Sequence, residues 1–192
     1  MPLETRTLSR KLELRSAGAG KTIGGYAAVF NSETDIGGYF REVIAPGAFR
    51  DTLSGDVRAL IDHNSGRVIG RTTAGTLRLS EDSTGLACEI DLPETTDAQD
   101  LATLIERGDI SGMSFGFEVT KQTWDETGPV PVRTIEAVNL FEVSVVAFPA
   151  YPDTTIAMRS LEAARRDRPI HPAHKRIAER KARTEQAARG IR

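Results

Sequence analysis

Cysteine is almost absent from this chain of 192 residues, which contains Cys88 alone. A single cysteine cannot form an intramolecular disulfide, so a disulfide-stabilised secreted fold is excluded. No stretch approaches the ~20 consecutive apolar residues that are needed to span a bilayer. The first residues, MPLETRTLSRKLELRSAG, also lack the apolar core of a secretory signal. We therefore expect a soluble protein that is intracellular at synthesis and has no membrane contact.

Histidine is nearly as rare, with three copies in the whole chain. His63 lies in the body of the chain, whereas His171 and His174 lie in the C-terminal segment. Two histidines without cysteine or carboxylate neighbours do not make a zinc site, so we expect no metal. The segment GAGKT at residues 18–22 lacks the first glycine and the strand–loop–helix context of a phosphate-binding loop. We therefore expect no cofactor either.

The net charge of −2 conceals an uneven distribution along the chain. Residues 1–159 have a balance of −8, from 15 basic and 23 acidic side chains, and residues 160–192 have a balance of +6, from 10 and 4. An acidic body argues against nucleic acid as the main ligand. We expect a body over residues 1–158 and a basic, mobile or cleavable helical tail over residues 159–192, because that tail has few large apolar groups.

Apolar alternation predicts a mainly β fold of the α+β class. Strands are expected within residues 8–30, 57–72, 75–93, 111–119 and 132–148, with a hairpin over 75–93. A helix is expected over residues 96–107, with Thr96 and Gln99 at capping-box spacing and Gly108 as its stop. This pattern predicts one domain with a substantial core.

The segment SGMSFGFEV at residues 111–119 carries the candidate nucleophile. In a strand, Phe115, Phe117 and Val119 point to one side, toward the core, and Ser114 and Gly116 point to the other. Glycine leaves space beside the hydroxyl for a partner or a substrate backbone. Most serines beside a glycine in a strand are structural, so Ser114 is a nucleophile only if a base accompanies it.

The candidate base is His63, because histidine accepts protons near neutral pH. It ends the apolar segment ALIDH, at a strand end where catalytic groups are common. Glu142 lies among apolar neighbours in NLFEVSVVAF and needs a partner, because an unpaired buried charge is unfavourable. That partner is His63 or an arginine, with Arg58, Arg71 and Arg133 as candidates. Asp62 and Asp109 are alternative orienting acids, Asp62 the poorer one.

The order and spacing of six segments resemble the prohead maturation proteases of tailed bacteriophages, which are serine peptidases related in fold to the herpesvirus assemblins. The segments are GYAAVFN, EVIAPGAF, LIDHNSGRVIGRTTAGTLRL, GLACEIDLP, IERGDISGMSFGFEV and FEVSVVAFPAYPDT. The resemblance places the family's histidine at His63 and its serine at Ser114 rather than Ser111. The acidic third member corresponds to Glu142, where the assemblins use a second histidine.

The resemblance implies a compact β-barrel-like body with surrounding helices. It also implies a serine endopeptidase of capsid maturation, which acts inside the immature capsid in the bacterial cytoplasm. Its partners would be the scaffold protein or the major capsid protein, which it would cleave, and a second copy of the chain, which it also cleaves in many members. A non-catalytic scaffold protein on the same fold is the alternative function. A cysteine protease that uses Cys88 ranks third, and Arg71 is a candidate oxyanion ligand.

Overall fold

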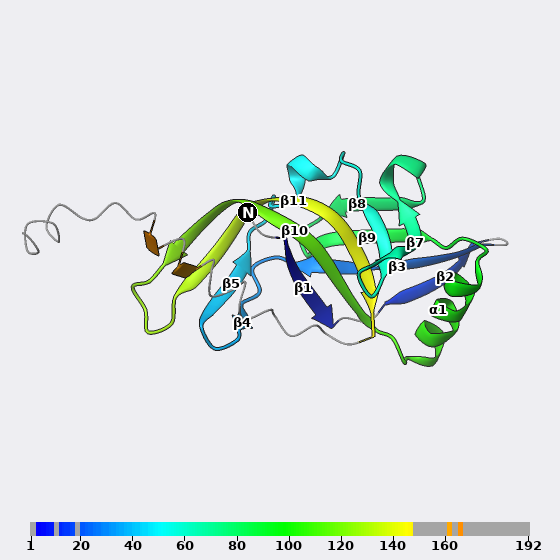
Figure 1. Cartoon of the computed structure of the whole chain (residues 1–192), viewed down its shortest axis with the longest axis horizontal. Helices are drawn as coiled ribbons and strands as arrows, with labels where there is room; N and C mark the ends of the chain where they lie inside the picture. Colours follow the sequence, from blue (N-terminus) through cyan, green and yellow to red (C-terminus); the bar gives the residue numbers. More distant parts are fainter. Residues whose placement is uncertain (1–2, 10–11, 18–19, 148–160, 163–164, 167–192) are drawn as a thin grey trace, which may run out of the picture. The chain divides into compact units, whose positions relative to one another are not determined.

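A computed structural model describes residues 3–9, 12–17, 20–147, 161–162 and 165–166 (Figure 1). The chain divides into two units, Met1–Met158 and Arg159–Arg192. The first unit holds both β-sheets. The basic tail expected over residues 159–192 lies almost wholly outside the described residues and stays a prediction.

The larger sheet is built around a long hairpin, which curves across Figure 1. Its central strand β11 pairs antiparallel with β10, and pairs in parallel with β5 along its first half and with β6 along its second half. The strand order is β1-β10-β11-β5-β4, and β7 joins through β6. The bounds are β1 Glu4–Ser9, β4 Thr34–Ile36, β5 Phe40–Ile44, β6 Arg58–Ile61, β7 Asn64–Arg71, β10 Gly112–Asp125 and β11 Val132–Val146.

The smaller sheet has the antiparallel order β2-β3-β9-β8. Its strands are β2 Glu13–Ala17, β3 Gly20–Val29, β8 Leu77–Glu81 and β9 Gly85–Asp91. The hairpin predicted over residues 75–93 is confirmed as β8 and β9. Its turn is held by Asp82, whose Oδ1 accepts hydrogen bonds from the backbone N–H groups of Thr84 at 2.6 Å and Gly85 at 3.1 Å.

Helix α1, Thr96–Arg107, confirms the predicted helix, and it ends at Gly108 with a φ of 83° that favours glycine. The prediction of a capping box at Thr96 and Gln99 was wrong. The N-cap is Thr95, so the third helical position falls on Ala98, which has no polar side chain to close a box. Two short 3-10 helices, Arg50–Thr52 and Thr72–Ala74, complete the helical content of the described part of residues 3–147. The mainly β class is confirmed, and α1 is the one α-helix among the described residues up to 147.

The core lies between the two sheets and fixes the position of β10. Phe115, Phe117 and Val119 are buried, as predicted. The Phe115 ring stacks on Phe117 at 4.7 Å between centroids and meets Phe49 edge-on at 5.4 Å. Each buried phenylalanine contributes about 1.5–3 kcal/mol to stability. Because these core side chains occupy one face of β10, a polar side chain of this strand can lie on its opposite face.

Candidate active site

Strand register gathers the candidate residues on one face of the larger sheet. Ser114 lies opposite Ser144, and Gly116 lies opposite Glu142, in the antiparallel pairing of β10 and β11. Directly opposite residues of such a pair share a face. We call the face that carries these four residues the catalytic face. It is opposite to the core face of Phe115.

Gly116 creates the space in which the Glu142 carboxylate lies. A Cβ atom at Gly116 would lie 2.5 Å from Glu142 Oε1 and 3.2 Å from its Cγ and Cδ atoms. Carbon and oxygen atoms do not approach this closely without displacement. The space predicted beside Ser114 is therefore occupied by the acidic side chain of the neighbouring strand.

His63 reaches this face from a tight turn between β6 and β7. Ile61 pairs with Asn64, so Asp62 and His63 are the two central residues, with φ values of 50° and 57°. Two consecutive positive φ values are typical of a type I′ hairpin, which usually contains asparagine or glycine there. The turn is fixed by Asp62, whose Oδ1 accepts the backbone N–H of Ala147 at 3.1 Å. Strained backbone of this kind often marks a functional position.

His63 and Glu142 form the central contact of the site. Nδ1 of His63 lies 2.7 Å from Oε1 of Glu142, and the two side chains are 28% and 14% exposed. The hydrogen bond that His63 donates to the Glu142 carboxylate, helped by the charge of that carboxylate, outweighs burial and raises the pKa of His63 above its usual 6.5. The other ring nitrogen, Nε2, is buried and has no hydrogen-bond partner in the described structure. An imidazole held at Nδ1 with a free Nε2 is the arrangement of a general base.

Ser144 completes the support of the pair, and the sequence analysis missed it. Its hydroxyl donates to Glu142 Oε2 at 2.5 Å and accepts the backbone N–H of His63 at 3.2 Å. The hydroxyl therefore orients the carboxylate and also ties the turn to β11. The available signal was the alternation in EVS, which puts Glu142 and Ser144 on the same face of one strand.

Ser114 lies on the same face but makes different contacts. It is fully buried, its Oγ donates to the backbone carbonyl of Arg6 at 2.9 Å, and it accepts from Thr7 Oγ1 at 3.1 Å. Both partners belong to β1, which pairs with β10 so that Thr7 lies opposite Ser114. The sequence analysis did not predict this strand. The structure thus joins His63 and Glu142 directly and places Ser114 beside them, bonded to β1.

Residues 9–167 match the protein family described as caudovirus prohead serine protease. The chain belongs to this family. It is 34% identical over 173 residues to the prohead protease of Enterobacteria phage HK97, which covers 84% of this chain and 72% of that protein. Its fold is similar to that of the bacteriophage T4 capsid assembly protease, with a TM-score of 0.56 at 14% identity over 77% of this chain and 98% of that one. The chain is therefore a peptidase of the capsid maturation type.

The other candidate groups of this prohead protease are engaged elsewhere. Arg58 and Arg71 both pair with Asp56, and Asp109 pairs with Arg107. Arg133 pairs with Glu4 and Glu42. These ion pairs leave His63 as the partner of Glu142.

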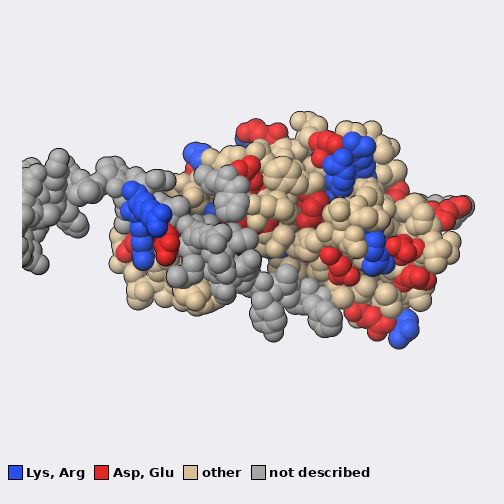
Figure 2. Space-filling view, in the orientation of Figure 1, with Lys and Arg blue, Asp and Glu red and all other residues tan. Residues whose placement is uncertain are grey.

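Cys88 does not suit nucleophilic chemistry in this fold. Burial raises the pKa of its thiol to about 12, so the thiol is protonated at neutral pH. On the face in Figure 2, acidic and basic side chains are interspersed rather than gathered into one patch. Among the described residues, no group of three metal-ligating side chains converges, and no helix is long and apolar enough to cross a membrane.

Proposed function

We propose that this prohead protease is a serine endopeptidase with Ser114 as nucleophile, His63 as general base and Glu142 as orienting acid. The observation that carries the proposal is the His63 ring. It is bonded through Nδ1 to Glu142 on β11, the strand that pairs with the Ser114 strand β10, and its buried Nε2 has no hydrogen-bond partner in the described structure. Because Nδ1 is held by the carboxylate, Nε2 is the ring nitrogen that is available to accept a proton.

The reaction would proceed through an acyl-enzyme. Ser114 Oγ bonds to the scissile carbonyl carbon, its proton moves to His63 Nε2, and the carbonyl electron pair moves to the oxygen. The C–N bond then breaks, and Nε2 gives the proton to the leaving amine. A water molecule, deprotonated by the same nitrogen, attacks the ester carbonyl and releases the serine. Throughout, Glu142 stabilises the imidazolium that forms.

These reaction steps require a change in the hydrogen bonding of Ser114. Its hydroxyl proton is engaged by the Arg6 carbonyl, so the first step begins when that hydrogen bond is exchanged for one to His63. Catalytic hydrogen bonds often form or shorten only once substrate is bound. The mechanism therefore does not require a hydrogen bond between Ser114 and His63 in the substrate-free protein.

The substrates that we propose are the scaffold protein, the scaffolding region of the major capsid protein, and the chain itself. The names of the HK97 and T4 relatives, a prohead protease and a capsid assembly protease, support this choice. The site of action would be the immature capsid in the bacterial cytoplasm. Fold relationship to the assemblins, self-association and the lack of a nucleic-acid ligand remain predictions.

Co-expression with the capsid and scaffold proteins, followed by intact-mass measurement, tests this function. We expect the wild-type chain to produce discrete cleavage products, and Ser114→Ala to produce none while remaining folded. Ser111→Ala is the matched control, because Ser111 is exposed and lies three residues earlier in the chain. Cleavage by Ser114→Ala at the wild-type rate would show that Ser114 is not the nucleophile.

A further inference from the structure

Strand β1 covers the part of β10 that carries Ser114. It is the edge strand of the larger sheet, and its six residues pair with Gly112–Phe117 of β10. Without β1, this stretch of β10 would present an unpaired backbone edge beside the nucleophile. Such an edge is a binding site for an extended peptide, which adds to the sheet as a further strand.

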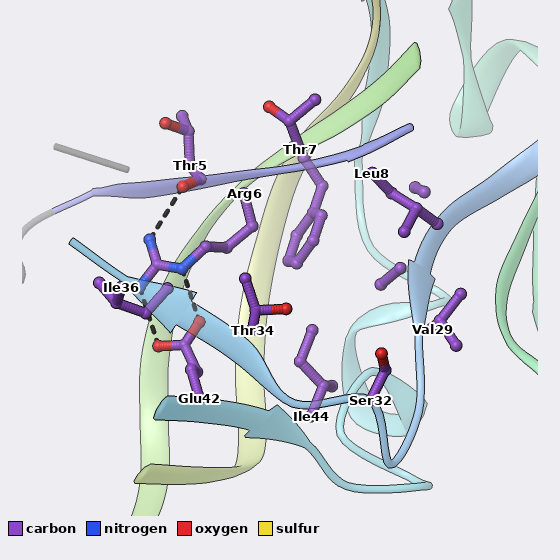
Figure 3. A pocket seen from close by; sticks show the side chains of 13 residues that line it. Thr5, Arg6, Thr7, Leu8, Val29, Ser32, Thr34, Ile36, Glu42 and Ile44 are labelled. Atoms are coloured by element: carbon purple, nitrogen blue, oxygen red, sulfur yellow. Dashed lines mark hydrogen bonds and ion pairs between the residues drawn. The ribbon is translucent and has the colours of Figure 1, made fainter. Parts of the chain in front are cut away.

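The Arg6 carbonyl lies where the carbonyl group of a substrate would lie. Its oxygen is 2.9 Å from Ser114 Oγ. Because neighbouring side chains alternate, Thr5 and Thr7 point to the catalytic face and Arg6 points to the opposite side. Figure 3 shows this alternation, with the Arg6 side chain directed into a cavity toward Glu42 of β5. The cavity, of about 80 Å³, is lined by β1, β3, β4, β5 and Phe115, and also by Ser32.

Two charged side chains of β1 are held by two charged side chains of the body. The guanidinium of Arg6 bonds to Glu42 Oε1 at 2.5 Å and Oε2 at 2.8 Å. Both oxygens of Glu4 accept from Arg133 at 2.9 Å. Burial alone would raise the pKa of Glu4, but the hydrogen bonds and charges of Arg133 and Arg6 outweigh it and lower that pKa. Glu4 is therefore ionised in the bound strand.

The charge balance of this cluster is the same with and without β1. Arg133 Nη1 lies 2.9 Å from Glu42 Oε2, so the two body residues already form an ion pair when β1 is removed. Departure of β1 takes away one acid and one base together. A replacing strand restores all the bonds only if it presents an acid toward Arg133 and, two residues later, a base toward Glu42.

We propose that β1 occupies the peptide-binding site of the protease as an internal competitor, and that an extended substrate segment with an acid–any–base pattern displaces it. The substrate pairs with Gly112–Phe117, and its basic residue carries the carbonyl that Ser114 attacks. Glu42 and Arg133 determine this specificity. The inference rests on the proposed function for its catalytic meaning, but the binding event itself requires no catalysis.

A peptide-binding measurement tests the displacement on the full-length chain. The probe is a fluorescent Glu-Thr-Arg-Thr-Leu-Ser peptide, and its control is the same peptide with Glu and Arg exchanged. Both are measured by anisotropy in the Ser114→Ala background, which prevents turnover. The variant Glu4→Gln/Arg6→Gln weakens the hold on β1, and Glu13→Gln/Arg15→Gln is its matched control. That second pair has the same spacing on β2 but is exposed, with side chains 59% and 58% accessible.

We expect the β1 variant to bind the first peptide at least tenfold more tightly than the β2 variant does, and at least tenfold more tightly than it binds the exchanged peptide. Equal affinities in the two variants would show that β1 does not compete for the site. Equal affinities for the two peptides would show that the charged cluster does not select the ligand. Either result overturns the inference.

A reversible crosslink tests whether β1 must leave for cleavage. Leu8 and Met113 are directly opposite each other, and opposed residues of antiparallel strands have the spacing that a disulfide needs. The Leu8→Cys/Met113→Cys chain should lose at least 100-fold of its cleavage rate when oxidised and regain it on reduction. Full activity of the oxidised form would refute displacement. If the wild-type chain cleaves nothing while peptide binding behaves as expected, the proposed function fails and the binding site stands.

Discussion

A methyl group at Gly116 should disable the active site and leave the fold intact. The added Cβ would lie 2.5 Å from Glu142 Oε1, whereas ordinary contacts begin at about 3.4 Å, so the carboxylate must move by roughly 0.9 Å. That movement displaces the carboxylate from its 2.7 Å hydrogen bond geometry with His63. Misplacement of a catalytic group by about 1 Å reduces rates by about 10²-fold, and full loss of the orienting acid by about 10⁴-fold. We therefore expect kcat/KM to fall by about 10²- to 10⁴-fold.

The change in stability should be small by comparison. Overpacking at a well-packed position destabilises by about 1–3 kcal/mol. Gly24→Ala is the matched control, since Gly24 also lies in a strand and its added Cβ would come no closer than 3.7 Å to any other atom. Cleavage kinetics and thermal unfolding are measured on both variants. If Gly116→Ala retains kcat/KM within threefold of Gly24→Ala, the carboxylate at this position does not support catalysis.

Three further predictions follow from the same contacts. Because Glu142 raises the pKa of His63, and the neutral ring is the base, kcat/KM should fall as the pH drops through a value above 6.5. Glu142→Gln should move that fall to lower pH, and an unchanged pH profile would assign the fall to another group. Ser144→Ala should lower kcat by about tenfold in a folded chain, since it removes one hydrogen bond of about 1–1.5 kcal/mol to the Glu142 carboxylate. An unchanged kcat would limit Ser144 to a structural role. Asp62→Ala should lower the free energy of unfolding by about 1–3 kcal/mol, because alanine disfavours the positive φ and lacks the hydrogen bond to Ala147. Denaturant titration measures this change, and a value below about 0.5 kcal/mol would contradict the claim that Asp62 fixes the turn.

The pairing of His63 with Glu142 shows what local sequence could and could not supply. A carboxylate in an apolar strand must have a partner, and the structure shows that the partner of Glu142 is His63. The sequence left four possible partners open, because the choice depends on register. The parallel pairing of β6 with β11 puts Ile61 opposite Val145, and from the turn that follows His63 reaches back to Ser144 and Glu142.

Local sequence patterns could not predict the turn at Asp62 and His63 or strand β1, and the reasons differ. Asp62 and His63 are not the asparagine and glycine that are typical of a two-residue hairpin, so the sequence indicated a strand end at His63 but not the tight turn. Residues 4–9 form a short polar strand, and its partner strand β10 lies more than 100 residues away in the chain, as in the bond between Arg6 and Ser114. Such a strand is stabilised by tertiary ion pairs and not by its own propensity.

Reaction of the chain with a fluorophosphonate, followed by mapping of the adduct by peptide mass spectrometry, tests the central claim most directly. The account predicts one adduct on Ser114, faster labelling in Glu4→Gln/Arg6→Gln, and loss of labelling in His63→Ala, because the hydroxyl is weakly nucleophilic without its base. Labelling of Ser111 or another serine, or labelling of Ser114 at the same rate in His63→Ala, would contradict it.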